Sequence, residues 1–383
     1  MKLVVRVKLL PTPEQASALD ATLRACNRAA GHVARVAFEQ GVTSRNDLQR
    51  LVYAEVKASF GLSAQPTVRV VKKVVDAYAA RRGKAVRRAV VFRPEAAQPF
   101  DDRCLSWQID AGTVSVWTLA GRMKGLGFVC SPDQLKTLAH HRKGESDLVR
   151  EGGKWFLAAT CEVPEQPVYE PVDWIGVDRG IVNLATTSDG VNYQGRRLGR
   201  YRRRHARKRA ELQAKGTRSS KRRLALRAGR ERRHANQVNH RISKEIVAVA
   251  QRTGRGIAVE HLDGIRERVR LRRDQRAAFT SWPFRQLGEH LSYKAKRAGV
   301  PFVEVDAAYT SQRCPRCGHT ARANRATRED FTCRLCGLAG PADVVAGVNV
   351  RDRARSAWVF VTAPASVPSS RESGWMRPVT VLP

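Results

Sequence analysis

Two pairs of cysteines, each with two residues between its members, constrain the fold of this chain more than any other feature of its sequence. Cys314 and Cys317 form the first pair, and Cys333 and Cys336 form the second after fifteen intervening residues. This spacing is typical of zinc ribbons, because two intervening residues let both sulfurs of a pair point at the same ion. Four thiolates fill a tetrahedral shell, so the sequence predicts one structural Zn²⁺ ion in a zinc ribbon at residues 312–340.

The other cysteines give no sign of an extracellular disulfide framework. Cys26, Cys104, Cys130 and Cys161 are scattered through predicted helix and strand, which fits a reducing compartment. The N-terminal residues lack the long apolar run of a signal peptide, and no stretch approaches the ~20 apolar residues of a membrane span. We therefore expect a cytoplasmic prokaryotic protein with no membrane partner.

The charge balance indicates a polyanionic partner. Lys and Arg number 70 against 35 Asp and Glu, which gives a net charge of +35 and a pI of about 11.0. Such an excess repels itself unless phosphates neutralise it and release their counterions. A GC-rich genome would explain the preference for Arg over Lys but not the shortage of acidic residues. Nucleic-acid binding is therefore the predicted class of function.

The length of 383 residues favours two or three domains, of which the first is predicted to be a small β-barrel with a helical insertion. Residues 2–9 alternate as a strand, and Thr12 begins a helical region with a capping signal. We expect the β-barrel at residues 1–10 and 86–168 and the helical insertion at 11–85. The later barrel strands are expected at 89–92, 105–109, 113–118, 127–130, 148–151 and 154–163.

A run of basic residues from 196 to 233 is predicted to form a helical hairpin with its turn at 216–220. It contains only two acids, Glu211 and Glu231. The run could be a solvated face, but like charges at this density repel along a helix, so phosphate contact is favoured. The candidate nucleic-acid contacts are Arg196, Arg197, Arg202, Arg203, Arg204, Arg207, Lys208, Arg222 and Arg223.

Three acidic residues stand in apolar surroundings. Asp178 ends the apolar run 174–177, Glu260 ends another at 257–259, and Asp343 begins a predicted helix. Each acid alone could form a salt bridge or a helix cap, because a buried carboxylate is costly without a cation. Together they form the pattern needed for two Mg²⁺ ions, which prefer oxygen ligands and support phosphodiester cleavage. The residues alone leave both interpretations open.

Several segments resemble motifs of the TnpB family of transposon-associated nucleases. Residues 175–190 are similar to the first motif of the family's RuvC-like, RNase H-fold nuclease domain, 257–262 to the second and 342–349 to the third. Residues 310–318 are similar to the family's entry into its zinc ribbon. Residues 8–15 are also similar to the family, and residues 281–295 resemble the helix that precedes its ribbon. The resemblance extends over about residues 1–355 and is most specific at 174–350.

The resemblance implies RNA-guided cleavage of DNA. Asp178, Glu260 and Asp343 match the family's catalytic acids and would hold two Mg²⁺ ions, and the four cysteines match its zinc ligands. The partners implied are a guide RNA made from the transposon end and target double-stranded DNA that carries a short motif beside the cut site. A monomer is favoured, and the protein would associate with the nucleoid when bound to DNA.

The fold implied by the resemblance is multidomain α/β. An RNase H-like (RuvC) nuclease domain at residues 169–311 and 341–358 would contain the zinc ribbon as an insertion and would follow the β-barrel. Residues 359–383 are rich in Pro and Ser and would form a flexible tail. Two departures from the family's pattern leave every ligand in place: Gly347 replaces a commoner alanine, and residues 339–341 are less polar than usual.

Other functions are weighed against this one. A compact type V CRISPR effector would share the fold and the active site, and a repeat array in the flanking DNA would identify it. A relative that binds DNA without cutting would lack one of the acids, whereas all three are present. A strand-joining transposase would usually end its acidic triad with Glu, and a junction resolvase would not need the N-terminal half.

Overall fold

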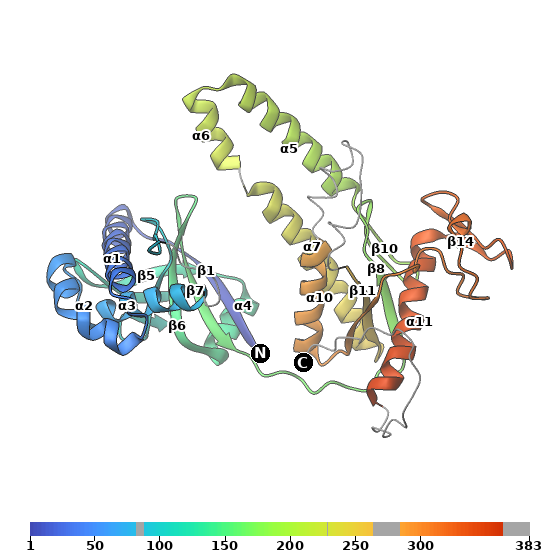
Figure 1. Ribbon diagram of the computed structural model, residues 1–383, viewed down its shortest axis with the longest axis horizontal. Helices are drawn as coiled ribbons and strands as arrows, with labels where there is room; N and C mark the ends of the chain where they lie inside the picture. Colours follow the sequence, from blue (N-terminus) through green and yellow to red (C-terminus); the bar gives the residue numbers. More distant parts are fainter. Residues whose placement is uncertain (82–87, 228, 263–283, 363–383) are drawn as a thin grey trace. The chain divides into compact units, whose positions relative to one another are not determined.

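The computed structural model describes residues 1–81, 88–227, 229–262 and 284–362. The chain divides into two compact units, Met1–Pro164 and Glu165–Pro383 (Figure 1). The predicted tail begins within α11 (Ala342–Thr362), so its first residues are helical, and the remainder lies outside the described residues. None of the helices in the described ranges is long and apolar enough to cross a membrane.

The N-terminal unit is built on a seven-stranded sheet in the order β2-β6-β7-β1-β5-β4-β3. All of its neighbouring strands pair antiparallel. β1 (Lys2–Leu9) lies at the centre, because it pairs with β7 along its length and with β5 at its last two residues. The other strands are β2 (Gln98–Phe100), β3 (Leu105–Gln108), β4 (Thr113–Thr118), β5 (Gly121–Val129), β6 (Arg142–Glu151) and β7 (Lys154–Glu162).

The two edges of this sheet approach each other, so the sheet is nearly closed. β2 and β3 lie at opposite edges but are joined by residues 101–104 alone. On β3, Nε1 of Trp107 donates a hydrogen bond to Oγ of Ser146 on β6, the strand beside the other edge (3.3 Å). No ladder joins β2 to β3 among the described strands. The predicted barrel is therefore a nearly closed sheet around one apolar core.

Three helices follow β1 in the chain. α1 (Pro13–Glu39) begins with a capping box in which Thr12 and Gln15 each accept a hydrogen bond from the other's backbone N–H, as the sequence predicts. α2 (Arg45–Phe60) and α3 (Ala64–Ala79) pack against α1 and against each other. The three helices enclose an apolar core distinct from that of the sheet.

Two local predictions for this unit are wrong. Residues 89–92 form no strand; Val90 joins the helical core, and its backbone N–H donates to the Tyr78 hydroxyl (3.4 Å). α4 (Pro132–His141), a short helix between β5 and β6, was not predicted either, although Ser131, Pro132 and Gln134 repeat the capping signal that begins α1. Residues 82–87, at the predicted boundary between helices and barrel, lie outside the described residues.

The C-terminal unit contains a mixed five-stranded sheet in the order β10-β9-β8-β11-β12. β9 runs antiparallel to both β8 and β10, whereas β11 runs parallel to β8 and to β12. The carboxyl ends of β8, β11 and β12 therefore meet at one edge of the sheet. The strands are β8 (Trp174–Asp178), β9 (Asn183–Thr187), β10 (Asn192–Gln194), β11 (Gly256–His261) and β12 (Phe302–Asp306).

Helices cover both faces of this sheet (Figure 1). α7 (Arg230–Arg252) and α10 (Phe284–Ala298) share an apolar core with the face that carries Ile175. α11 packs on the opposite face, which carries Trp174. Because alternate residues of a strand point to opposite faces, β8 supplies both cores.

Two smaller features complete this unit. α5 (Arg196–Lys215) and α6 (Arg218–Arg227) form the helical hairpin predicted for the basic run, with Gly216 in the left-handed conformation between them (φ 61°). β13 (Asp330–Thr332) and β14 (Ala339–Pro341) form a two-stranded antiparallel ribbon around the second cysteine pair.

Candidate functional site

Two of the three predicted catalytic acids lie at the ends of neighbouring parallel strands. Asp178 is the last residue of β8, and Glu260 lies one residue before the end of β11. The register pairs Val177 with Val259, so the two acids follow side by side on strands about 4.8 Å apart. Ala258 packs against α11, so by alternation Glu260 faces that helix as well. Glu260 is buried and Asp178 is partly exposed.

The third acid, Asp343, stands in the first turn of α11, and two glycines let this helix lie directly on β8. A Cβ on Gly176 would stand 2.0 Å from the carbonyl oxygen of Gly347, and a Cβ on Gly347 would stand 3.0 Å from the backbone nitrogen of Ser188. Gly347 therefore has a packing role. The close contact of helix and strand brings the first turn of α11 towards the ends of β8 and β11.

The three carboxylates share one electrostatic environment. Burial raises the pKa of Asp178 well above its ordinary value of 3.8, and the negative charges of Glu260 and Asp343 raise it further. Burial also raises the pKa of Glu260, although the hydrogen bond from Thr310 opposes this rise. Carboxylates that repel one another in a buried site favour either protons or a bound cation. The arrangement is therefore a candidate site for divalent cations.

Glu260 is held by two residues that the sequence did not single out as site residues. The Thr310 hydroxyl donates a hydrogen bond to Oε1 of Glu260. Arg179 is buried, and its guanidinium donates to the backbone carbonyls of Glu260 and Phe284. Both residues fall within segments that resemble the family's motifs, which is the only sequence signal that could have indicated them.

Asp343 is held at both of its carboxylate oxygens. Nδ2 of Asn183 donates to Oδ2 (2.9 Å), and Nη2 of Arg325 donates to Oδ1 (2.8 Å). Asn183 falls within the first family-like motif, whereas Arg325 lies between the two cysteine pairs and carried no sequence signal. The acid is thus oriented by one strand and by the segment between the two cysteine pairs.

The four cysteines meet the geometry of a metal site. Their sulfur atoms all lie within 4.8 Å of one another, and Sγ of Cys314 is 3.6 Å from that of Cys336. A tetrahedral shell with Zn–S bonds of ~2.3 Å requires sulfurs about 3.8 Å apart. Burial opposes ionisation of Cys333, but the backbone N–H groups of Cys336 and Leu335 lower its pKa to about 6. The cluster can therefore hold the predicted zinc ion.

The three carboxylates are grouped less tightly than the cysteines. Within the described residues, the cysteines are the only set of three or more His, Cys, Asp or Glu side chains whose ligand atoms all lie within 4.8 Å of one another. The oxygens of Asp343 instead contact Asn183 and Arg325.

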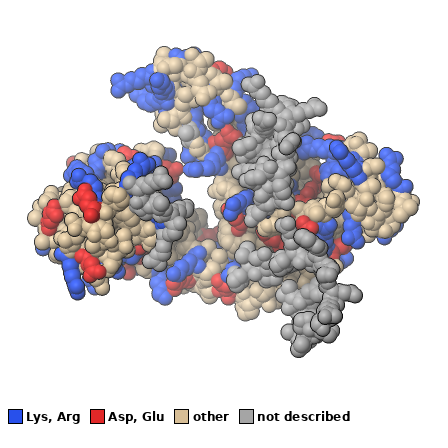
Figure 2. Space-filling model, viewed as in Figure 1, with Lys and Arg blue, Asp and Glu red and all other residues tan. Residues whose placement is uncertain are grey.

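The predicted nucleic-acid contacts lie on the hairpin of α5 and α6, where Lys and Arg side chains gather on the visible face (Figure 2). Eight of the nine are exposed to solvent. Arg202 differs, because its side chain is only 17% exposed and its Nε lies 3.4 Å from Oε1 of Glu231. The exposed residues are Arg196, Arg197, Arg203, Arg204, Arg207, Lys208, Arg222 and Arg223.

Two family models match the chain. Residues 158–264 match a family described as "Probable transposase", and this segment includes Asp178 and Glu260. Residues 284–350 match the "Cas12f1-like, TNB domain", and this segment includes the four cysteines and Asp343. The candidate site residues therefore fall within the matched segments.

Curated relatives are similar over part of the chain. The "Putative RNA-guided DNA endonuclease InsQ" of Escherichia coli K12 is 28% identical over 218 residues, which cover 52% of this chain and 53% of InsQ. A "TnpB-like protein" of Methanocaldococcus jannaschii is 31% identical over 144 residues, 37% of this chain and 51% of that protein. The "CRISPR-associated endodeoxyribonuclease Cas12f1" of Syntrophomonas palmitatica is 24% identical over 228 residues, 55% of this chain and 45% of that protein. The chain spans about half the length of these relatives.

A solved structure of CasPhi-2 (Cas12j) bound to crRNA is similar in fold. Its TM-score is 0.52 at 10% sequence identity, and the alignment covers 92% of this chain and 98% of that one. At this identity the likeness concerns the fold alone. It supports the mixed α/β architecture described above.

Proposed function

We propose that the chain is a member of the TnpB family and an RNA-guided DNA endonuclease of a transposon, which cuts target DNA beside a short flanking motif. In this proposal an RNase H-like (RuvC) nuclease domain comprises residues 169–311 and 341–358, with the zinc ribbon 312–340 inserted. The mixed sheet with helices on both faces supports that assignment. A wedge-like β domain at 1–10 and 86–168, with the helical insertion, precedes it.

The catalytic proposal depends on the meeting of Asp178, Glu260 and Asp343 at one edge of the sheet. Glu260 and Asp343 both raise the pKa of Asp178, so three negative charges act on one small region. Mg²⁺ suits such a region because it binds through a few carboxylates and keeps several waters. When bound, two Mg²⁺ ions would activate the attacking water and stabilise the leaving oxygen of the phosphodiester.

The surrounding residues would orient the acids for this chemistry. Thr310 fixes one oxygen of Glu260 with its hydroxyl, and Asn183 fixes one oxygen of Asp343 with its amide. Arg325 supplies part of the positive charge that this edge of the sheet requires. Glu260 and Asp343 would thus each be held by partners that do not carry a negative charge.

The zinc ion would be structural, because four thiolates leave no open coordination position. The position of the ribbon directly before α11 supports a second role for the zinc ion. β14 ends at Pro341 and α11 begins at Ala342, whose backbone N–H donates to the carbonyl of Glu329 (2.8 Å). The folded ribbon would therefore fix the start of the helix that carries Asp343.

Guide RNA and target DNA are the proposed partners. Base pairing with the RNA would supply sequence specificity, while the protein holds the backbones and recognises the flanking motif. The exposed arginines of the α5–α6 hairpin would contact phosphates of the heteroduplex or of the displaced strand. We propose that the protein acts as a monomer in the cytoplasm and associates with the nucleoid when it is bound to DNA.

A compact type V CRISPR effector is the second candidate, favoured by the match of residues 284–350 to a Cas12f1-like domain. The two candidates share an active site, so the flanking DNA must decide between them: a repeat array indicates CRISPR, and transposon ends indicate a transposon. A guided protein that binds without cutting is disfavoured because all three acids are present.

The deciding experiment combines RNA sequencing with cleavage. The full chain would be purified together with its bound RNA, and that RNA would be sequenced. The complex would then be incubated with Mg²⁺ and with plasmids that carry a target matching the RNA beside a randomised flanking sequence. We expect cutting by the native chain and by Asp306→Ala, an exposed acid that also ends a strand. Asp178→Ala should bind the same target without cutting it. Cutting by Asp178→Ala at the native rate would contradict the proposed active site.

A further inference from the structure

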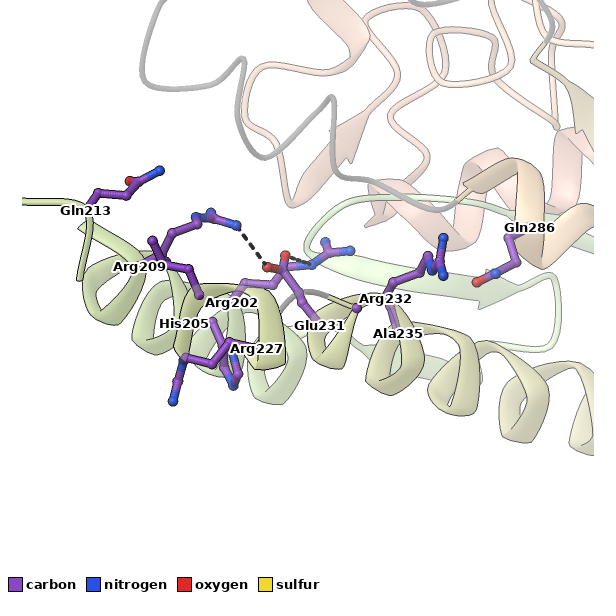
Figure 3. Close-up of a pocket in the computed structure, with 11 residues that line it drawn as sticks. Arg202, His205, Arg209, Gln213, Arg227, Glu231, Arg232, Ala235 and Gln286 are labelled. Atoms are coloured by element: carbon purple, nitrogen blue, oxygen red, sulfur yellow. Dashed lines mark ion pairs between the residues drawn. The ribbon is translucent and has the colours of Figure 1, made fainter. Parts of the chain in front are cut away.

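A cavity of about 540 Å³ opens at the junction of α5, α6 and α7 (Figure 3). Guanidinium groups reach it from all three helices: Arg202 and Arg209 from α5, Arg227 from α6 and Arg232 from α7. Gln286 of α10 completes one side. Figure 3 shows Arg202 and Arg209 reaching towards one carboxylate, while Arg232 and Gln286 lie at the other end.

The cavity carries an excess of positive charge. Glu231 is its single lining acid, and its carboxylate lies 3.4 Å from Nε of Arg202 and 3.9 Å from Nη1 of Arg209. Arg227 and Arg232 have no acidic partner in the part of the chain that the structure describes. Four guanidinium groups against one carboxylate leave three positive charges around one volume. Positive charges around one volume repel one another unless an anion binds between them.

The walls suit a ligand larger than a bare ion. Leu224 and Ala235 contribute apolar surface, and Gln213 and Gln286 contribute amide donors and acceptors. Burial lowers the pKa of His205, so its ring favours the neutral form and can pack against an aromatic base. The volume falls within the roughly 300–1,000 Å³ of small-ligand pockets. A phosphate attached to a base matches both the charge and the lining.

We propose that this cavity binds a single nucleotide of a nucleic-acid strand, and that Arg227 and Arg232, which lie at different ends of it in Figure 3, contact the phosphates on the two sides of that nucleotide. Glu231 holds Arg202 and Arg209 in place, so the strand meets cations that are already ordered. A base can enter a cavity only after it leaves its stack, so the nucleotide must be unpaired. The inference rests on the proposed function for the class of partner. The strand is either the guide RNA or single-stranded target DNA.

The test compares two double variants of the full chain that lose the same charge. Arg227→Gln with Arg232→Gln removes the unpaired cations of the cavity. Arg218→Gln with Lys221→Gln removes two exposed cations of α6 that do not line it. Fluorescence anisotropy would measure the dissociation constants for a short single-stranded RNA, for DNA of the same sequence and for a fully paired DNA duplex.

We expect the cavity variant to weaken single-strand binding about ten-fold more than the control, as loss of a charge-assisted hydrogen bond predicts. Duplex binding should weaken equally in the two variants. A larger loss for RNA identifies the guide as the source, and a larger loss for DNA identifies the target. Equal losses of single-strand affinity in both variants overturn the inference, and they leave the proposed nuclease intact if the native chain still cuts guided targets.

A third variant fills the cavity without changing its charge. Leu224→Trp should weaken single-strand binding but leave duplex binding at the native affinity, because every basic side chain of the outer surface remains. Circular dichroism and the thermal midpoint would confirm that the hairpin still folds. Native affinity in a folded Leu224→Trp chain would also overturn the inference.

Discussion

Nη2 of Arg325, in the segment between the two cysteine pairs, lies 2.8 Å from Oδ1 of Asp343 in the first turn of α11. Both side chains are largely enclosed, with 23% and 20% of their surfaces exposed. The same guanidinium opposes the rise in pKa of Asp178 and of Glu260. One side chain of the ribbon therefore counterbalances acids that come from two strands and a helix.

We expect Arg325→Gln to lower the free energy of unfolding of the Mg²⁺-free chain by about 1–2 kcal/mol, because it removes a partly buried charge partner from the acids. The pKa of Asp178 should rise further for the same reason. Added Mg²⁺ should restore most of the lost stability. Urea denaturation with and without Mg²⁺ measures both effects. Arg322→Gln, an exposed change in the same segment, is the control. A loss that Mg²⁺ leaves unchanged would show that Arg325 only packs the ribbon.

Asp178→Asn should stabilise the metal-free chain near neutral pH. The raised pKa means that the folded state binds this proton more tightly than the unfolded state does. The stability of the native chain therefore falls as the pH rises from the ordinary value of 3.8 through the folded pKa, whereas asparagine has no such loss.

The thermal midpoints of Asp178→Asn and the native chain should thus coincide at acid pH and separate as the pH rises. Mg²⁺ should reverse the order, since only the native chain keeps the full set of ligands. Asp306→Asn, outside the acidic cluster, is the control. A difference between Asp178→Asn and the native chain that does not change with pH would contradict the electrostatic account.

Local sequence signals predicted much of the fold. The alternating run of β1 and the capping residue Thr12 specify their elements with contacts a few residues apart. The failures depend on tertiary packing. Val90 is apolar, but it packs into the core of the three helices and belongs to no strand. α4 is only ten residues long and buries only Thr137 and Leu138, so its apolar pattern is weak even though Ser131 and Gln134 form a complete capping box.

For the candidate site, too, local sequence signals indicated some residues, whereas others become evident only in the folded structure. Strand-end acids and cysteine spacing are visible in a short window of sequence, which is why the family resemblance finds them. The partners of Asp343 are not visible in a short window of sequence. Asn183 lies 160 residues away, and Arg325 contacts Asp343 only when the segment between the cysteine pairs is folded. The contact of Gly176 with Gly347 likewise becomes evident only when the helix lies on the strand.

Gly176→Ala should lower the free energy of unfolding by about 3 kcal/mol, a large loss typical of overpacking against backbone. The new Cβ would meet the Gly347 carbonyl oxygen at 2.0 Å, and no side-chain movement can relieve a clash with backbone. Denaturation curves measure the loss. Gly31→Ala is the matched control, because nothing lies within 4 Å of its Cβ and alanine favours helix. The account fails if the two variants are equally stable.

Neutralising Arg203 and Arg204 should weaken nucleic-acid binding and reduce its dependence on salt. For duplex DNA, each phosphate that a basic side chain neutralises contributes about 0.9 to the slope of log affinity against log salt, so removing the pair should reduce the slope by about 2. Arg202 is left out because its pairing with Glu231 makes its loss a structural change. Filter binding over a range of salt concentrations gives the slope. Unchanged affinity and slope would remove this part of the hairpin from the interface.

Zinc removal should disable the catalytic edge through the helix that follows the ribbon. Cys317→Ser leaves three thiolates, so we expect the metal content to fall and the ribbon around the buried Phe331 to unfold. Because β14 runs directly into α11, Asp343 should lose its position and guided cutting should fall even at high Mg²⁺. Cys130→Ser changes a partly exposed cysteine outside the cluster and should keep both metal and cutting. Zinc analysis, circular dichroism and a cleavage assay on the same samples test whether zinc binding supports cutting. Cys317→Ser that loses its zinc and still cuts at the native rate would contradict this prediction.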